Sequence, residues 1–288
     1  MSEEELKSMR HSLAHIMAQA IQHLWPQAKF GVGPAIDNGF YYDIYLDNGT
    51  ISEADLPKIE EEMRKIVADN YPFERRDVSV EEAIDWAIKG DQTFKMELLN
   101  DLKRSGTTVA SELAGEKMGS VSDGDSKVET VSLYSQGDYT DLCRGGHVDS
   151  TGKVGAFKLT KTAGAYWRGN ENNPQMQRIY GVAFATQEEL DEYLNRLEIA
   201  KQRDHRKLGK ELDLYTTSPL VGIGLPLFTP RGTILRDIVA RYSNQLRQKF
   251  GFEKVWTPHI TKKDLYETSG HWAKFGEELF LVKSQETS

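Results

Sequence analysis

The sequence predicts an α+β protein with two regions joined by a helical connector. Three observations predict this fold class. Amphipathic helical patterns open the chain and recur before residue 90, β-prone segments separated by turn residues lie between and after them, and one long charged helical pattern begins near residue 186. A chain of 288 residues, 39% of them hydrophobic, is long enough for one large domain or two modest ones.

The first predicted helix covers residues 8–26 and ends at Pro26, because proline cannot continue a helix. Its apolar residues recur on one face: Leu13, Met17, Ala20, Ile21 and Leu24. Strand, turn, strand, turn is expected next, since the aromatic run FYYDIYL lies between the turn pairs Asn38-Gly39 and Asn48-Gly49.

Two further helices are predicted before residue 91. The first lies within residues 52–72, where apolar side chains repeat with helical spacing at Leu56, Ile59, Met63 and Ile66. The second covers residues 79–90, with Ser79 as its N-cap and Gly90 as its stop. Residues 106–125 are rich in glycine, serine and aspartate, so we expect a mobile surface insertion there.

The second half of the chain is expected to contain more strands, then the connector and the second region. Strand-like segments are predicted at 127–134, 155–169 and 176–186. Residues 186–215 predict one long helix that turns from acidic to basic, as the helix dipole favours. Beyond it we expect loops, an amphipathic helix over 233–251 and a strand over 252–260.

The composition restricts the compartment and the class of partner. Cys143 is the only cysteine, so the fold does not rest on an internal disulfide and a reducing cytoplasm is expected. The acidic opening MSEEELKSMR is unlike a signal peptide, and no apolar run approaches the roughly 20 residues that span a membrane. The net charge of -8 argues against indiscriminate binding to nucleic acid, although a local basic face can still hold RNA.

Four side chains form a candidate chemical site. His11 and His15 stand four residues apart on one helical face, and Cys143 and His147 stand four apart around a Gly-Gly turn. Three imidazoles and a thiolate are a sufficient tetrahedral ligand set for Zn²⁺. The alternative is that both histidines lie on the surface and that Cys143 is a small core residue. For the remaining candidates, His23, His205, His259 and His271, no second ligand stands nearby in the sequence.

The chain resembles bacterial-type threonyl-tRNA synthetase, a resemblance carried by MRHSLAHIMAQAIQHLWP, GVGPAIDNGFYYDI, DYTDLCRGGHVDSTG, FKLTKTAGAYWRGNENNPQMQRIYG and AKQRDHRKLGKELDLY. It implies three parts. Residues 1–185 would be the editing domain, the second additional domain of threonyl- and alanyl-tRNA synthetases. Residues 186–210 would be a linker helix, and residues 211–288 the first, incomplete part of a class II antiparallel-sheet catalytic domain.

The resemblance implies that the first part hydrolyses serine wrongly attached to threonine tRNA. The implied editing residues are His11, His15, Tyr42, Lys95, Asp141, Cys143 and His147. In this hypothesis Lys95 stabilises charge or protonates the leaving ribose oxygen, and His11 positions or deprotonates water. Asp141 orients the substrate amino group, Tyr42 closes one wall, and His15, Cys143 and His147 shape the pocket. The implied editing needs no cofactor, while zinc on His11, His15, Cys143 and His147 stays a candidate.

The resemblance also implies what a complete family member contains and this chain does not. The segment KFGFEKVWTPHI is similar to motif 1 of class II synthetases, with Pro258 ending a dimer-interface strand. The parts that bind ATP, magnesium, the synthetic-site zinc and the anticodon should follow it, so this chain is not expected to make threonyl-tRNA. Implied partners are the acceptor end of tRNA(Thr), serine, threonine and a second subunit, and the half-built sheet is expected to be sticky.

Two hypotheses compete with editing. The chain could be a freestanding zinc-dependent deacylase of the alanyl type, or a non-catalytic RNA-binding or dimerisation remnant. Gly146 stands where the family usually has proline, which is expected to loosen the turn holding His147.

A mixed basic and aromatic segment is a second candidate for RNA contact. It could grip a single-stranded CCA end, or consist of core aromatics and solvated charges: Lys158, Lys161, Tyr166, Trp167, Arg168 and Arg178. The basic residues of the connector are expected to be a solvated face first and an RNA contact second: Lys201, Arg203, Arg206, Lys207 and Lys210.

Overall fold

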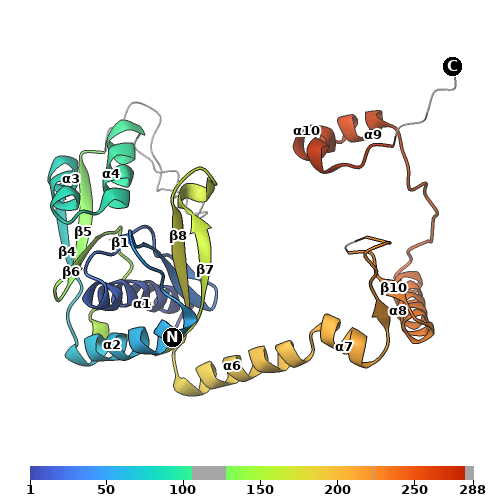
Figure 1. The fold of residues 1–288 in the computed structure, drawn as a ribbon, viewed down its shortest axis with the longest axis horizontal. Coiled ribbons are helices and arrows are strands. Elements are labelled where there is room, and N and C mark those ends of the chain that lie inside the picture. The colour runs from blue at the N-terminus through green and yellow to red at the C-terminus, as the bar shows by residue number, and fades with distance from the viewer. Residues whose placement is uncertain (106–127, 223, 283–288) are drawn as a thin grey trace. The chain divides into compact units, whose positions relative to one another are not determined.

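The computed structural model describes residues 1–105, 128–222 and 224–282, which form two compact units, residues 1–200 and 201–288. The first unit combines helices with antiparallel sheets, as the α+β prediction requires (Figure 1). The insertion predicted at 106–125 lies outside the described residues. In the described part of the chain, no helix has the length and apolar character needed to cross a membrane.

Helix α1 (Glu3–Leu24) is the central helix of the first unit. It starts earlier than predicted, because Ser2 and Glu5 form a capping box and acidic residues fill its first turn. The apolar face predicted from the sequence is confirmed: Leu13, Met17, Ala20 and Ile21 are fully buried. Helix α2 (Leu56–Asp69) packs against α1 through Leu56, Ile59, Met63 and Ile66, which are buried as predicted. A short 3-10 turn (Glu53–Asp55) precedes α2.

The main sheet provides one wall of the core. Its strands run in the order β1-β3-β8-β7, all antiparallel, with β2 paired to β3: β1 (Lys29–Phe30), β2 (Ala35–Ile36), β3 (Gly39–Tyr45), β7 (Ala156–Tyr166) and β8 (Gln175–Phe184). Helix α1 packs on β3 and α2 packs on β7, so the core lies between the helices and the sheet. Two 3-10 turns flank β7, Thr151–Lys153 and Trp167–Gly169.

A second, smaller layer carries three elements that the sequence analysis missed. Strands β4 (Glu74–Ser79), β5 (Thr130–Gln136) and β6 (Tyr139–Leu142) form a three-stranded antiparallel sheet. Helices α3 (Val80–Lys89) and α4 (Thr93–Ser105) pack on each other, and α3 packs on β4 and β5. Ser79 caps α3 and Gly90 ends it, as predicted. Strands β4 and β6 and helix α4 were not predicted.

The connector is two helices and not the single helix predicted over 186–215. Helix α6 (Gln187–Gln202) ends before Asp204, whose backbone is not helical, and α7 (His205–Glu211) begins after it. The Asp204 side chain accepts a hydrogen bond from the Arg206 backbone at 2.8 Å. An aspartate that caps the next helix in this way competes with continuing the first one.

Among its described residues, the second unit contains α7, a short hairpin and three further α-helices. Strands β9 (Tyr215–Thr216) and β10 (Leu227–Phe228) pair antiparallel, and α8 (Pro230–Lys249) confirms the predicted helix. Helices α9 (Lys263–Thr268) and α10 (His271–Phe275) and a 3-10 turn (Gly276–Glu278) follow.

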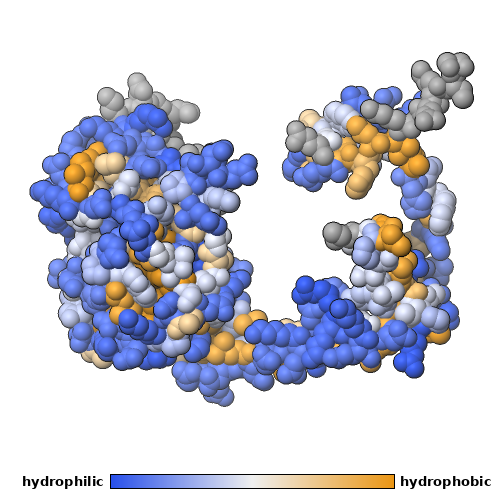
Figure 2. All heavy atoms as spheres, in the orientation of Figure 1, coloured by the Kyte–Doolittle hydropathy of each residue, from blue (hydrophilic) through white to orange (hydrophobic). Residues whose placement is uncertain are grey.

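The strand predicted over 252–260 is not formed. A strand is stable only when a neighbouring backbone satisfies its N–H and C=O groups, and within the described part of this unit none pairs with this segment. Its apolar side chains are therefore exposed, including Val255 at 78% and Trp256 at 83%. Figure 2 shows hydrophobic residues on the surface of this unit.

Candidate functional site

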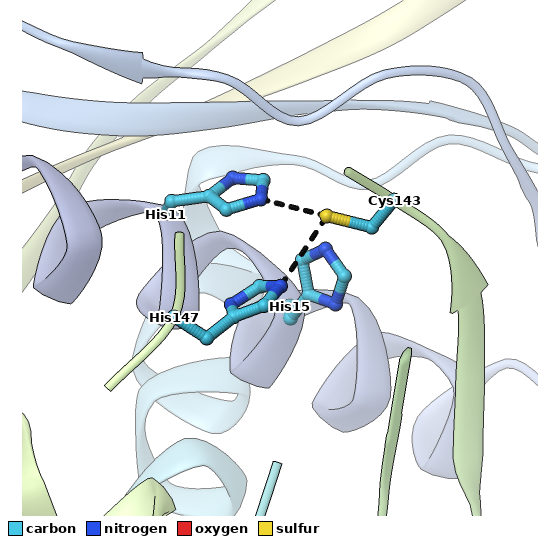
Figure 3. A group of neighbouring side chains, drawn as sticks. All are labelled: His11, His15, Cys143 and His147. Atoms are coloured by element: carbon cyan, nitrogen blue, oxygen red, sulfur yellow. Dashed lines mark hydrogen bonds between the residues drawn. The ribbon is translucent and has the colours of Figure 1, made fainter. Parts of the chain in front are cut away.

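The four-residue cluster that the sequence predicted is formed by two residues of one helix and two residues of one loop. Helix α1 presents His11 and His15, and the loop after β6 presents Cys143 and His147 (Figure 3). His11 Nε2 lies 3.0 Å from Cys143 Sγ, which lies 3.3 Å from His147 Nε2. One nitrogen or sulfur from each of the four lies within 4.8 Å of the others. The alternative that both helical histidines are surface residues is wrong for His15, which is 2% exposed.

The turn that carries Cys143 and His147 depends on two glycines. Gly145 has φ +102° and Gly146 has φ +80°, conformations that L side chains rarely adopt. A Cβ on Gly145 would also meet the Tyr134 hydroxyl at 2.3 Å, whereas open space surrounds Gly146. Proline, with φ fixed near about -65°, cannot adopt the conformation at Gly146.

Hydrogen bonds at the Nδ1 atoms of His11 and His147 fix which ring nitrogen of each residue carries the proton. The Gly33 carbonyl can only accept, so His11 Nδ1–H donates to it across 3.2 Å. Ser12 Oγ donates its proton to the Ser8 carbonyl at 2.9 Å, so we assign His147 Nδ1 as the donor to Ser12 Oγ at 3.2 Å. Both Nε2 lone pairs then face the Cys143 sulfur.

Burial keeps Cys143, His15 and His147 uncharged at neutral pH. It raises the pKa of the Cys143 thiol to about 12, although the Gly145 backbone N–H acts in the opposite direction. It also lowers the pKa of His15 well below its ordinary value, and the neighbouring His11 and Lys95 lower it further. The pKa of His147 is likewise lowered by burial, then by His15 and His11. The site therefore presents acceptor nitrogens around a protonated thiol.

A buried ion pair stands beside the cluster. Lys95, on the unpredicted helix α4, places Nζ 2.6 Å from Asp141 Oδ1 and 3.0 Å from the Tyr42 hydroxyl. Tyr42 in turn donates to Asp141 Oδ2, and the Leu142 backbone N–H donates to Asp141 Oδ1 at 2.8 Å. Burial and the Asp141 charge hold the pKa of Tyr42 well above its usual value, so the hydroxyl stays a donor. His15 Nε2 lies 3.8 Å from Asp141 Oδ2, which joins the two groups.

These side chains share one cleft of about 810 Å³. Six of the seven predicted site residues line it: His11, His15, Tyr42, Lys95, Asp141 and Cys143. His147 does not line the cleft, and it stacks at 4.6 Å on Phe73 with its ring nearly parallel. The cleft is large enough for a nucleoside carrying an amino acid.

Some residues of the basic and aromatic segment are buried or ion-paired, and others are exposed. Trp167 is 3% exposed and donates to Glu97 at 2.8 Å, which favours the core alternative for this residue. Arg178 makes a bidentate pair with Asp43, and Arg168 lies 2.7 Å from Asp101. Tyr166 keeps 47% of its surface exposed at the cleft. The basic residues of the connector are all exposed: Lys201, Arg203, Arg206, Lys207 and Lys210.

Comparison with known proteins shows which proteins this chain is similar to. Residues 131–180 match the threonyl and alanyl tRNA synthetase second additional domain. The chain is 48% identical over 277 residues to threonine–tRNA ligase of Geobacillus sp. (strain WCH70), and 49% identical over 280 residues to threonine–tRNA ligase 1 of Bacillus subtilis (strain 168). This chain is a homologue of the threonine–tRNA ligases. The matches cover 96% and 97% of this chain but only 39% and 40% of those ligases.

Only part of the site lies within the segment that matches the second additional domain. The segment that matches the second additional domain contains Asp141, Cys143 and His147. His11, His15 and Lys95 lie before it, on helices α1 and α4. The fold therefore assembles the predicted site residues of one cleft from four separate stretches of a threonine–tRNA ligase homologue: α1, β3, α4 and the segment around β6.

Proposed function

We propose that this cleft hydrolyses the ester bond of seryl-tRNA(Thr), releasing serine that was attached to the wrong tRNA. The observation that carries the proposal is the buried Lys95–Asp141–Tyr42 group beside the histidine cluster, in one cleft of a threonine–tRNA ligase homologue. A cation, several proton acceptors and space for an aminoacyl nucleoside are the components that ester hydrolysis needs.

The need for such a reaction follows from the size of the substrates. Serine lacks one methyl group of threonine, and a binding pocket discriminates such a difference by only about 1 to 3 kcal/mol. A second site that hydrolyses the smaller product adds the missing fidelity. In this role the cleft would receive the acceptor end of tRNA(Thr) with serine attached, and would leave threonyl-tRNA(Thr) intact.

The reaction itself is attack of water on the ester carbonyl. A new C–O bond forms to water, the bond between the carbonyl carbon and the ribose oxygen breaks, and a proton moves to that ribose oxygen. We assign the water to His11, whose Nε2 carries a lone pair beside the cleft while Nδ1 is anchored on Gly33. Lys95 stabilises the negative oxygen of the tetrahedral state or protonates the leaving ribose oxygen.

The remaining residues hold the substrate in this scheme. Asp141 orients the serine ammonium, and Tyr42 closes one wall while fixing the Asp141 carboxylate. His15, Cys143 and His147 shape the pocket. A nucleophilic role for Cys143 is disfavoured, because a thiol of pKa about 12 is almost entirely protonated at neutral pH.

Zinc-dependent hydrolysis is the second candidate, favoured by the mutual approach of the four ligand atoms. His11, His15, Cys143 and His147 would hold the ion, and small movements would bring atoms now within 4.8 Å to the spacing of about 3.5 Å that tetrahedral Zn²⁺ requires. A bound zinc ion supplies a Lewis acid that lowers the pKa of water. Binding also requires loss of the Cys143 proton, which the raised pKa of this thiol opposes.

The wider assignments of the ligase relatives extend to this chain as proposals. Residues 1–185 would be the editing domain, 186–210 the linker and 211–288 part of a class II catalytic domain. Joining threonine to its tRNA with ATP and magnesium, binding the synthetic-site zinc, and pairing of subunits through residues 252–260 are likewise proposals carried over from the ligase relatives. The compartment proposed for all of these activities is the cytoplasm.

The deciding experiment measures serine release from seryl-tRNA(Thr) and threonine release from threonyl-tRNA(Thr), each with and without a chelator. Selective serine release that survives chelation supports metal-free editing, and release restored only by zinc supports the second candidate. His11→Ala and Lys95→Ala are expected to abolish release while tRNA binding persists. Lys89→Ala, which removes an exposed lysine of α3 outside the cleft, is the matched control. Absence of serine release from the wild-type chain would overturn both candidates.

A further inference from the structure

Helix α1 carries a continuous row of polar side chains that leads away from the cleft. His11, His15, Gln19 and His23 follow one another at four-residue intervals and so share one face of the helix. The row begins in the cleft at His11 and passes through the fully buried Gln19. It ends at the partly exposed His23, which contacts Glu62 at 2.8 Å and Asp138 at 3.0 Å.

The middle of this row contains four buried polar atoms without a hydrogen-bond partner among the described residues. They are His15 Nδ1, Gln19 Oε1, Gln136 Oε1 and Gln136 Nε2. An unsatisfied buried polar atom costs about 1 to 3 kcal/mol, so such a concentration requires a reason. Neither glutamine is assigned a role in the proposed hydrolysis.

The β5–β6 hairpin brings these atoms to one place. Gln136, 1% exposed, ends β5 and pairs with Tyr139 across the hairpin, whose tip is Gly137 and Asp138. Gln19 Nε2 lies against Gly137 and donates to Asp138 Oδ1 at 2.9 Å. On the other side, the Gln136 side chain is close enough to His15 to oppose the lowering of its pKa.

If these four atoms pair with one another, their donors and acceptors match in one sense only. The Asp138 carboxylate only accepts, so Gln19 must turn Nε2 outward to it and Oε1 inward. Gln19 Oε1 then needs a donor, and Gln136 Nε2 is one. Gln136 Oε1 is left as an acceptor, and the remaining atom, His15 Nδ1, must carry a proton to donate to it.

We propose that Gln136 is a positioning residue that keeps the proton of His15 on Nδ1, so that the Nε2 lone pair faces the cleft. This series of hydrogen-bonded side chains runs from His15 through Gln136 and Gln19 to Asp138, by direct hydrogen bonds or through one enclosed water. Such contacts are often long without substrate and tighten in the complex. His15 then matches His11 and His147, whose Nδ1 atoms are anchored outward on Gly33 and Ser12. All three Nε2 atoms become acceptors around Cys143.

The test reads the tautomer of His15 directly by NMR of the full chain labelled with ¹⁵N-histidine, with the signal assigned by comparison with His15→Gln. We expect the Nδ1–H form in the wild type. Gln136→Glu retains an acceptor and should keep this form, whereas Gln136→Leu should lose it. Gln202→Leu makes the same change at an exposed position of α6 and should have no effect. A wild-type His15 protonated on Nε2, or a tautomer unchanged in Gln136→Leu, overturns the proposal.

A second variant protects the test against misfolding of Gln136→Leu. Asp138→Asn changes a side chain that is 70% exposed, and the new amide can donate as well as accept. It removes the carboxylate that sets the donor-to-acceptor direction of these hydrogen bonds, so the His15 signal should become a mixture of the two tautomers. If Asp138→Asn shows only the unchanged Nδ1–H form, Asp138 does not set the direction of these hydrogen bonds.

The catalytic consequence rests on the proposed editing function, but the tautomer does not. Partners that orient metal-ligating histidines typically contribute about 10- to 100-fold in activity or metal affinity, and we expect the same scale for His15, whose Nε2 faces the reaction cleft. Gln136→Leu should therefore lower kcat for serine release by about that factor with KM unchanged, and Gln136→Glu should recover most of it. If the wild-type chain releases no serine, the editing proposal fails while the NMR measurement still decides the role of Gln136.

Discussion

Lys95 and Asp141 form an ion pair with 2.6 Å between Nζ and Oδ1, and both side chains are no more than 4% exposed. Removing one partner of such a buried pair leaves an uncompensated charge, which typically costs about 3 to 5 kcal/mol. Lys95→Ala should therefore lower the free energy of unfolding by about that amount, measured by chemical denaturation. Lys95→Met combined with Asp141→Asn should recover part of the loss. A single variant as stable as the wild type would show that the pair is not held as described.

This stability cost affects how activity data are interpreted. Lys95→Ala must be shown to be folded at the assay temperature before its lost activity is ascribed to chemistry. The Lys95→Met, Asp141→Asn double variant provides the control, because it removes both charges together. It should stay inactive even when folded, since no cation remains to stabilise the negative oxygen in the proposed scheme.

Cys143 is expected to react slowly with alkylating reagents. Its thiol has a pKa of about 12 instead of 9.0, so at pH 8 its thiolate fraction is about 1,000-fold smaller than that of an ordinary thiol. Because Cys143 is the only cysteine in the chain, the rate of iodoacetamide labelling reports on it alone. The rate should rise tenfold per pH unit up to pH 10. Rapid labelling at neutral pH would show a stabilised thiolate and would revive the nucleophile and the zinc-ligand roles.

His23 should make stability depend on pH. Burial alone would lower its pKa, but hydrogen bonds to Asp138 and Glu62 outweigh it and raise the pKa above 6.5. A raised folded-state pKa adds stability below the unfolded value, and that stability disappears as pH rises through the folded value. His23→Gln should thus lose more stability at pH 5.5 than at pH 9, by about 1 kcal/mol or less because the pair is partly exposed. Equal losses at both pH values would contradict this ion-pair role.

Gly146 should be hard to replace even though nothing crowds it. Its φ of +80° costs an L residue about 1 to 2 kcal/mol, and proline cannot reach it. Gly146→Ala should therefore weaken serine release by displacing His147, and Gly146→Pro should do so more strongly. Gly49→Ala is the matched control, because Gly49 has φ +105° in open space and does not line the cleft. It should lose similar stability without loss of activity.

The sequence predicted the parts of the site that follow a periodic pattern. Helix α1 shows clear helical spacing, so the pairing of His11 with His15 could be predicted from it. Helix α4 was missed although Phe94, Leu98 and Leu102, four residues apart, are all buried and carry the signal. It was missed because the polar residues between them, including Lys95, obscured the pattern.

Other parts of the site depend on contacts distant in sequence. Strand β6 has only four residues, too few for a periodic signal, and it exists because β5 pairs with it. The partnership of Lys95 with Asp141 joins residues that lie on different elements, and no local pattern specifies it. Gln136 carried no motif at all, and only its burial beside His15 reveals it. The predicted strand over 252–260 failed for the related reason that a strand requires a partner outside its own sequence.

The exposed apolar side chains of the second unit predict self-association. Phe250, Val255 and Trp256 are each at least 77% exposed, and Trp256 lies in the segment that was predicted as a strand. Exposed apolar surface of this kind favours association. Sedimentation velocity should show dimers or larger species that increase with protein concentration. Trp256→Glu should reduce them, whereas Trp86→Glu, on α3 of the first unit, should not, provided that variant folds. A stable monomer at high concentration would show that these side chains do not drive association.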